Sequence, residues 1–163
     1  MSTVKSSYIR GLWAGAPFLL MIVPFGMLFG VVATEAGFDI LQTMAMTMIV
    51  VAGAAQFSSV QVLSDGAPFY IAALTGIAVN MRMAMYSASL APHIGKSLKW
   101  HRIIAAYFLI DQTYGVSILE MDRKPDLPVN EKLIYFFGTA TLIFPLWYAS
   151  TYVGIILGST IPE

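Results

Sequence analysis

Two charged side chains, Arg82 and Asp111, lie inside long apolar stretches of the sequence. Because a charge in hydrocarbon is costly, an ionisable residue in such a stretch is a candidate for ligand binding or proton transfer. An aspartate that is withdrawn from water can take up a proton or hold a substrate ammonium group. Arg82 can bind a carboxylate, pair with Asp111, or extend its guanidinium to a lipid headgroup. The alternative for either residue is a permanent structural ion pair with a neighbouring helix.

Polar side chains accompany both charges. If the stretch around Asp111 is one helix, Tyr107 at i−4 and Tyr114 at i+3 share its face, and their hydroxyl groups can reach the carboxylate. Asn80 lies two residues before Arg82, so it points to nearly the opposite side of a helix. Small residues line that side, which can therefore admit a neighbouring helix or a ligand.

Gln56 is a third polar position, and it follows the small residues Gly53, Ala54 and Ala55. If the chain breaks at these small residues, a half-helix begins near Gln56. The free N–H groups and the positive dipole end of such a half-helix suit an anion, such as an amino-acid carboxylate. The alternative is ordinary packing of small residues against another membrane helix, and the residues alone favour it.

The composition indicates the environment of these residues. The chain has 163 residues, of which 58% are hydrophobic and 11% are charged, and its net charge is +0. A soluble domain carries about 25% charged residues, so this chain cannot cover a water-facing surface. The sequence therefore predicts an integral membrane protein and argues against a soluble enzyme, a disordered chain and a nucleic-acid binder. The absence of cysteine excludes a disulfide scaffold and a thiolate metal site.

Five apolar stretches approach or exceed the about 20 residues that a membrane helix needs. They are residues 11–33, 40–63, 67–91, 101–121 and 133–158. None shows the alternation of a barrel strand, and the connections between them are short. We therefore predict an all-α, polytopic integral membrane protein, with residues 1–163 in a single transmembrane domain.

The distribution of Lys and Arg predicts the orientation. Cytoplasmic loops are enriched in these residues, so Lys5 and Arg10 place the N-terminus in the cytoplasm. Five full crossings would then put the basic connection at residues 96–102 outside. The conflict disappears if segment 40–63 is a broken or re-entrant hairpin, and such backbone is tolerated only inside protein or beside a cavity. The alternative is a plain span in a chain whose charge bias is weak.

Motifs for catalysis are missing from the sequence. It contains no phosphate-binding loop, no G-x-S-x-G elbow and no His, Asp or Glu cluster with metal-ligand spacing. We therefore expect that the protein is not an enzyme and holds no cofactor and no metal.

Five groups of short motifs follow one another along nearly the whole chain, one group in each apolar stretch. They are Pro24-Phe25-Gly26 with Phe29-Gly30, Ala52-Gly53-Ala54-Ala55-Gln56-Phe57, Asn80-Met81-Arg82, Phe108-Leu109-Ile110-Asp111-Gln112, and Trp147 with Gly154 and Gly158. With these motifs, the sequence resembles the AzlC/YgaZ family, the large subunits of bacterial branched-chain amino-acid exporters. The resemblance covers about residues 11–161, and the Ala-Gly-Ala-Ala-Gln-Phe string is its most specific part.

The resemblance implies a multi-pass protein of the bacterial inner membrane that exports leucine, isoleucine, valine or a similar aliphatic amino acid such as methionine. Coupling of export to protons is one option, and a small membrane partner of the AzlD/YgaH type is implied. The candidate residues for substrate binding or coupling, at matching motif positions, are Gln56, Asn80, Arg82 and Asp111. The supporting residues are Phe57, Tyr107 and Tyr114. The alternative is a structural or channel-like subunit of a complex whose partner carries the transport.

Two departures from the family pattern are present. The family usually has Asp-Glu where this chain has Asp111-Gln112, which leaves one carboxylate fewer for a proton relay between two acids. Family members also continue with further spans after the position of Ile161.

Overall fold

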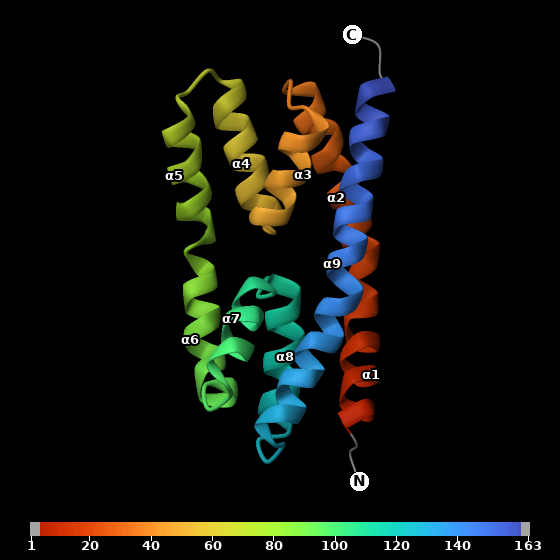
Figure 1. The fold of residues 1–163 in the computed structure, drawn as a ribbon, viewed down its shortest axis with the longest axis vertical. Coiled ribbons are helices and arrows are strands. Elements are labelled where there is room, and N and C mark those ends of the chain that lie inside the picture. The colour runs from red at the N-terminus through yellow and green to blue at the C-terminus, as the bar shows by residue number, and fades with distance from the viewer. Residues whose placement is uncertain (1–3, 161–163) are drawn as a thin grey trace. The chain divides into compact units, whose positions relative to one another are not determined.

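The computed structural model describes residues 4–160, and within that range the chain is helical and contains no strand (Figure 1). This confirms the prediction of an all-α fold. The elements are α1 (Val4–Gly15), the short 3₁₀ helix η1 (Ala16–Phe18), α2 (Leu19–Glu35), α3 (Ile40–Ile49), α4 (Gly53–Ser64), α5 (Phe69–Asn80), α6 (Arg82–Ile94), α7 (Lys99–Tyr107), α8 (Asp111–Arg123) and α9 (Val129–Thr160).

The helices are distributed between two compact units. The first unit ends its opening segment at Leu19 and continues with Arg82–Phe144, so it contains α1, η1, α6, α7, α8 and the first part of α9. The second unit contains Leu20–Met81 and the chain from Pro145 onward, which is essentially α2 to α5 with the second part of α9.

Among residues 4–160, two helical stretches are long and apolar enough to cross a membrane. They are Val4–Glu35, which joins α1, η1 and α2, and Val129–Thr160, which is α9, and each has 32 residues. At about 1.5 Å per residue, either one exceeds a hydrocarbon core of about 30 Å. These stretches contain the predicted segments 11–33 and 133–158.

Segment 40–63 is broken, as one of the two readings of the sequence predicted. The helix α3 ends at Ile49 and α4 begins at Gly53, and Ala52 between them has an extended backbone with φ −150° and ψ 95°. Figure 1 shows α3 and α4 as the two arms of a hairpin. The entry and exit of this hairpin on one side of the membrane stays a prediction.

Segment 101–121 is also broken, and the prediction of one continuous helix there was wrong. The helix α7 ends at Tyr107 and α8 begins at Asp111. Thr113 stabilises the break, because its hydroxyl accepts a hydrogen bond from the Ile110 N–H at 3.0 Å and lies 2.8 Å from the Phe108 carbonyl oxygen, to which it donates. Segment 67–91 is likewise divided, since α5 ends at Asn80 and α6 begins at Arg82.

The two units repeat one order of elements. In the second unit, α2 is followed by α3 and α4, which flank a break, and then by α5. In the first unit, α6 is followed by α7 and α8, which also flank a break, and then by the start of α9. In each case an extended residue, Ala52 or Ile110, precedes the second short helix. Each unit therefore presents one helix N-terminus at an internal break.

Close backbone contact at glycine holds α9 in place within each unit. In the first unit, a Cβ atom at Gly11 would collide with the carbonyl oxygen of Tyr135, and the Thr139 hydroxyl donates to the Gly11 carbonyl oxygen at 3.0 Å. In the second unit, a Cβ atom at Gly154 would collide with the backbone of Met27. Small residues at membrane helix interfaces allow this approach of one backbone to another.

Candidate functional site

Arg82 and Asp111 form an ion pair in the first unit. The Arg82 Nη2 atom lies 2.9 Å from the Asp111 Oδ2 atom. The other carboxylate oxygen, Oδ1, accepts a hydrogen bond of 2.7 Å from the Tyr86 hydroxyl. Both side chains of the ion pair are partly exposed, Arg82 to 30% and Asp111 to 38%. The structure therefore brings together two of the four predicted residues and adds Tyr86 to them.

The helix termini explain why these charges lie where they do. Asp111 is the first residue of α8, where a negative charge interacts favourably with the positive end of the helix dipole. Arg82 is the first residue of α6, where a positive charge is disfavoured by the same effect. The carboxylate of Asp111 offsets this cost, so Arg82 at this terminus depends on Asp111.

The hydroxyl of Tyr114 binds a residue other than Asp111, and the break before α8 separates Tyr107 from the helix that carries Asp111. Tyr114 stacks on Tyr86 with ring centroids 4.2 Å apart, and its hydroxyl donates to the Ser89 Oγ atom at 3.0 Å. Tyr107 belongs to α7 instead, and its ring contacts those of Phe108 and Phe144. Asp111 accepts its hydroxyl hydrogen bond from Tyr86. The feature of the sequence that could have identified Tyr86 is its position four residues after Arg82, on the same helix face.

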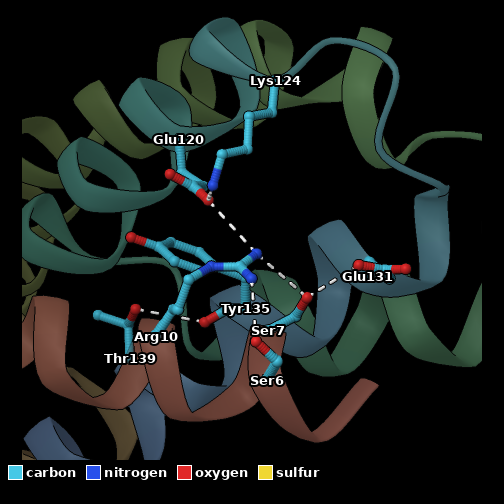
Figure 2. A network of polar contacts seen from close by, with 8 residues as sticks. All are labelled: Ser6, Ser7, Arg10, Glu120, Lys124, Glu131, Tyr135 and Thr139. Atoms are coloured by element: carbon cyan, nitrogen blue, oxygen red, sulfur yellow. Dashed lines mark hydrogen bonds and ion pairs between the residues drawn. The ribbon is translucent and has the colours of Figure 1, made fainter. Parts of the chain in front are cut away.

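A second polar network fixes the other end of α8, and Figure 2 shows it. Glu120 of α8 pairs with Arg10 of α1 at 3.4 Å and with Lys124 at 2.7 Å. Arg10 also donates to the Ser7 Oγ atom at 3.2 Å, and the Ser7 hydroxyl donates to Glu131 of α9 at 2.9 Å. Because both ends of α8 are held, Asp111 has a fixed place within the first unit.

The N-terminus of α4 in the second unit lacks a side-chain cap. Its N-cap residue, Ala52, makes no side-chain capping bond. The first intrahelical bond runs from the Gln56 N–H to the Ala52 carbonyl oxygen at 3.0 Å. The N–H groups of the residues before Gln56 have no partner inside the helix, and they carry the positive end of its dipole.

Gln56 itself is fully buried, with 0% of its surface exposed. Neither the Nε2 nor the Oε1 atom of its amide has a hydrogen-bond partner among the described residues. An unsatisfied buried polar group costs about 1–3 kcal/mol, so native proteins rarely retain one without a ligand or water to bind it. The amide of Gln56 is thus an available donor and acceptor inside the protein.

Aromatic rings surround the start of α4. A Cβ atom at Gly53 would lie 3.1 Å from the ring of Phe25 and 3.3 Å from that of Trp147. Phe57 packs edge-on against Phe25 at 5.2 Å between centroids. The indole N–H of Trp147 is already used, because it donates to the Thr47 Oγ1 atom at 2.8 Å. The setting combines apolar walls with the free amide of Gln56.

Asn80 is the last residue of α5 and also belongs to the second unit. Its Oδ1 atom is buried and has no partner among the residues that the structure describes. Within residues 4–160 there is no group of three or more His, Cys, Asp or Glu side chains that could hold a metal ion.

Comparison with known proteins identifies relatives across nearly the whole chain. The family model described as "AzlC protein" matches residues 17–161. The "Inner membrane protein YgaZ" of Escherichia coli (strain K12) is 28% identical over 156 residues, covering 95% of this chain and 62% of the relative. An "Uncharacterized membrane protein" of Helicobacter pylori (strain ATCC 700392 / 26695) is 29% identical over 141 residues, covering 86% of this chain and 60% of the relative.

An archaeal relative extends the same pattern. An "Uncharacterized membrane protein" of Archaeoglobus fulgidus is 27% identical over 161 residues, covering 98% of this chain and 67% of the relative. The chain thus spans about 60% of the length of the first two relatives, 62% and 60%. No solved structure matches it. The match of the family model over most of the chain shows that this membrane protein belongs to the AzlC family.

Proposed function

We propose that the protein is a secondary transporter subunit, not an enzyme, that exports branched-chain or similar aliphatic amino acids across the bacterial inner membrane. Its substrates would be leucine, isoleucine, valine and methionine, and it would act with a small membrane subunit of the AzlD/YgaH type. The observation that carries the proposal is Gln56, a fully buried amide without a partner at the uncapped N-terminus of α4.

The chemistry of this terminus fits an amino acid. A substrate carboxylate accepts hydrogen bonds from the first N–H groups of α4 and from the Gln56 Nε2 atom, as anions do at helix N-termini. The Gln56 Oε1 atom accepts a hydrogen bond from the substrate ammonium group. Phe25 and Phe57, whose rings pack together at this end of α4, offer an apolar surface to an aliphatic side chain. Broken helices in transporters use such half-helix termini for substrate carboxylates.

The comparison of the two breaks supports α4 as the anion site. The N-terminus of α8 carries the negative charge of Asp111, and the Thr113 hydroxyl accepts a hydrogen bond from the Ile110 N–H. The N-terminus of α4 has no acidic residue in its first turn and no side-chain cap. Of these two termini, α4 is the one that lacks an anion.

The ion pair of Arg82 and Asp111 is our candidate for coupling to protons. Arg82 and Tyr86 bind the two carboxylate oxygens of Asp111, and the start of α8 adds the helix dipole. We propose that proton exchange at Asp111 accompanies the opening of this cluster, which would couple the proton to a change of conformation. Export would then be driven by the proton gradient.

The alternative is a structural or channel-like subunit in which Arg82 and Asp111 hold a partner subunit. In the structure both charges already pair within the one chain, and Tyr86 binds the second carboxylate oxygen. Within the described residues, Asp111 thus has partners without a second subunit.

Efflux from proteoliposomes tests the proposal. The chain is reconstituted with its small partner, and the vesicles are loaded with labelled leucine, valine or methionine, or with serine as a polar control. We expect saturable efflux of the three aliphatic amino acids that rises with an imposed pH gradient, and no efflux of serine. Non-saturable flux of all four solutes would favour the channel-like alternative, and no flux of any would contradict the transporter.

A further inference from the structure

An apolar groove of about 190 Å³ lies between α6 and α7 in the first unit. Its walls include the side chains of Leu90, Ile94, Ala106 and Leu109, and its polar lining residues are Ser87 and Arg102. Pockets that enclose small molecules have volumes of about 300–1,000 Å³. The groove is smaller than such pockets, so it suits a segment of a hydrocarbon chain and not a whole small molecule. An anionic group attached to that chain could lie at the guanidinium of Arg102.

The charge around the groove is positive and unpaired. Lys96, Lys99 and Arg102 are exposed, and none has an acidic partner within salt-bridge distance among the described residues. The sequence between His93 and Asp111 contains no acidic residue. Other basic residues of the same unit, Arg10 and Arg82, are paired with carboxylates.

The surface next to the groove is apolar and exposed. Leu98 is 70% exposed and Trp100 is 73% exposed, and Ile103 and Ile104 of α7 follow at 49% and 46%. Tryptophan and basic side chains beside apolar residues are typical of the boundary between headgroups and acyl chains. The helix α7 thus has the composition of an element that lies at a lipid surface.

We propose that this groove binds an anionic phospholipid, with part of one acyl chain against Leu90, Ile94 and Leu109 and the phosphate at Arg102. Lys99 precedes Arg102 by three residues and shares its helix face, so it adds a second positive charge to the phosphate site. Basic sites between membrane helices bind anionic headgroups in this way. An amino acid fits the groove less well, because none of its lining residues is acidic and could hold the ammonium group.

Lipid retention by the purified full chain tests the proposal. The protein in neutral detergent is titrated with phosphatidylglycerol or with phosphatidylcholine of identical acyl chains, and bound lipid is counted by native mass spectrometry. We expect preferential binding of phosphatidylglycerol, weakened about fivefold by Arg102→Gln. Lys5→Gln is the matched control, since it removes one exposed positive charge elsewhere in the same unit and should leave binding unchanged.

A second pair of variants tests the place of the acyl chain. Ala106 is exposed and lines the groove, so Ala106→Phe fills the space and should reduce retention about as much as Arg102→Gln. Ala88 is also exposed but does not line the groove, so Ala88→Phe should bind lipid as the unmodified chain does. Circular dichroism and size-exclusion chromatography confirm that each variant is folded.

Three results would overturn the proposal. Equal losses in the Arg102→Gln and Lys5→Gln variants would indicate unspecific attraction to negative charge. Unchanged binding in Ala106→Phe would show that the acyl chain does not occupy the groove. Full displacement of the lipid by millimolar inorganic phosphate or glycerol phosphate would indicate a site for soluble anions.

Discussion

At the residue scale, Asp111 is held by three favourable interactions. Its two carboxylate oxygens bind Arg82 and Tyr86, and its place at the start of α8 adds the helix dipole. The proposed coupling role therefore rests on the contacts of this one carboxylate with Arg82 and Tyr86.

Replacement of Asp111 tests this coupling role. Asp111→Asn preserves the shape of the side chain but removes the charge and the exchangeable proton. We expect gradient-driven leucine efflux to fall to background, with assembly and detergent-solubilised yield unchanged, as measured in proteoliposomes. Normal gradient-driven efflux in this variant would refute the coupling role.

The two stacked tyrosines provide a finer test. Tyr86→Phe deletes the hydroxyl that donates to Asp111, whereas Tyr114→Phe deletes a hydroxyl that donates to Ser89. Loss of a partly exposed hydrogen bond worth about 1 kcal/mol corresponds to about fivefold in rate. We expect this reduction of coupled efflux in Tyr86→Phe and a smaller change in Tyr114→Phe, and the reverse order would contradict the assignment of Tyr86.

The sequence predicted some of these residues and missed others. The cost of a charge in an apolar stretch identified Arg82 and Asp111 without a structure. The expectation for Tyr107 assumed a continuous helix, but the break before Asp111 places Tyr107 on α7. The expectation for Tyr114 failed because its hydroxyl donates to Ser89 instead. Tyr86 was missed because a contact between distant helices leaves no local pattern beyond its spacing from Arg82.

At the scale of elements, the two internal breaks differ in how visible they are in the sequence. The break before α4 is followed by Gly53 and two alanines, and the charge bias of the loops also pointed to it. The break before α8 is apolar, Phe108-Leu109-Ile110, with neither Gly nor Pro to mark it. The local feature that marks it is Thr113, three residues after Ile110, whose hydroxyl accepts a hydrogen bond from the Ile110 N–H.

Helix packing at α9 gives a prediction on stability. A Cβ atom at Gly154 would collide with the backbone of Met27, whereas a Cβ atom at Gly115 of α8 would meet open space. We expect Gly154→Ala to lower stability by about 1–3 kcal/mol through overpacking. Gly115→Ala should raise stability by up to about 1 kcal/mol through helix propensity.

Thermal unfolding in detergent measures both variants. The expected result is a lower Tm for Gly154→Ala and an equal or higher Tm for Gly115→Ala. Equal decreases in both would show that the close contact of Met27 with Gly154 does not limit packing.

At the scale of the whole molecule, each unit contains the same order of elements, although the sequence shows no close repeat. The order is a helix, two helices on either side of a break, and another helix. Composition and hydropathy were enough to predict a helical membrane protein. They could not predict the repeated order, because the apolar stretch 101–121 hides the break before α8.

The membrane orientation is testable because the native chain contains no cysteine. Asp65 and Lys96 are exposed, and they lie in the connections after α4 and after α6. The distribution of Lys and Arg predicts that Asp65→Cys is labelled from outside the cell and Lys96→Cys from the cytoplasm. Labelling of Asp65→Cys from the cytoplasm would contradict the re-entrant reading of α3 and α4.

The central claim is that the free amide of Gln56 and the N-terminus of α4 bind the substrate. The most direct measurement is the KM for leucine efflux in proteoliposomes that contain Gln56→Met. Gln61→Met is the matched control, because Gln61 lies on the same helix but is exposed and already bonded to Asp65. We predict that KM rises about tenfold or more in Gln56→Met, since hydrogen bonds to a charged group contribute about 1.5–3 kcal/mol, and stays unchanged in Gln61→Met. An unchanged KM in Gln56→Met would contradict the claim.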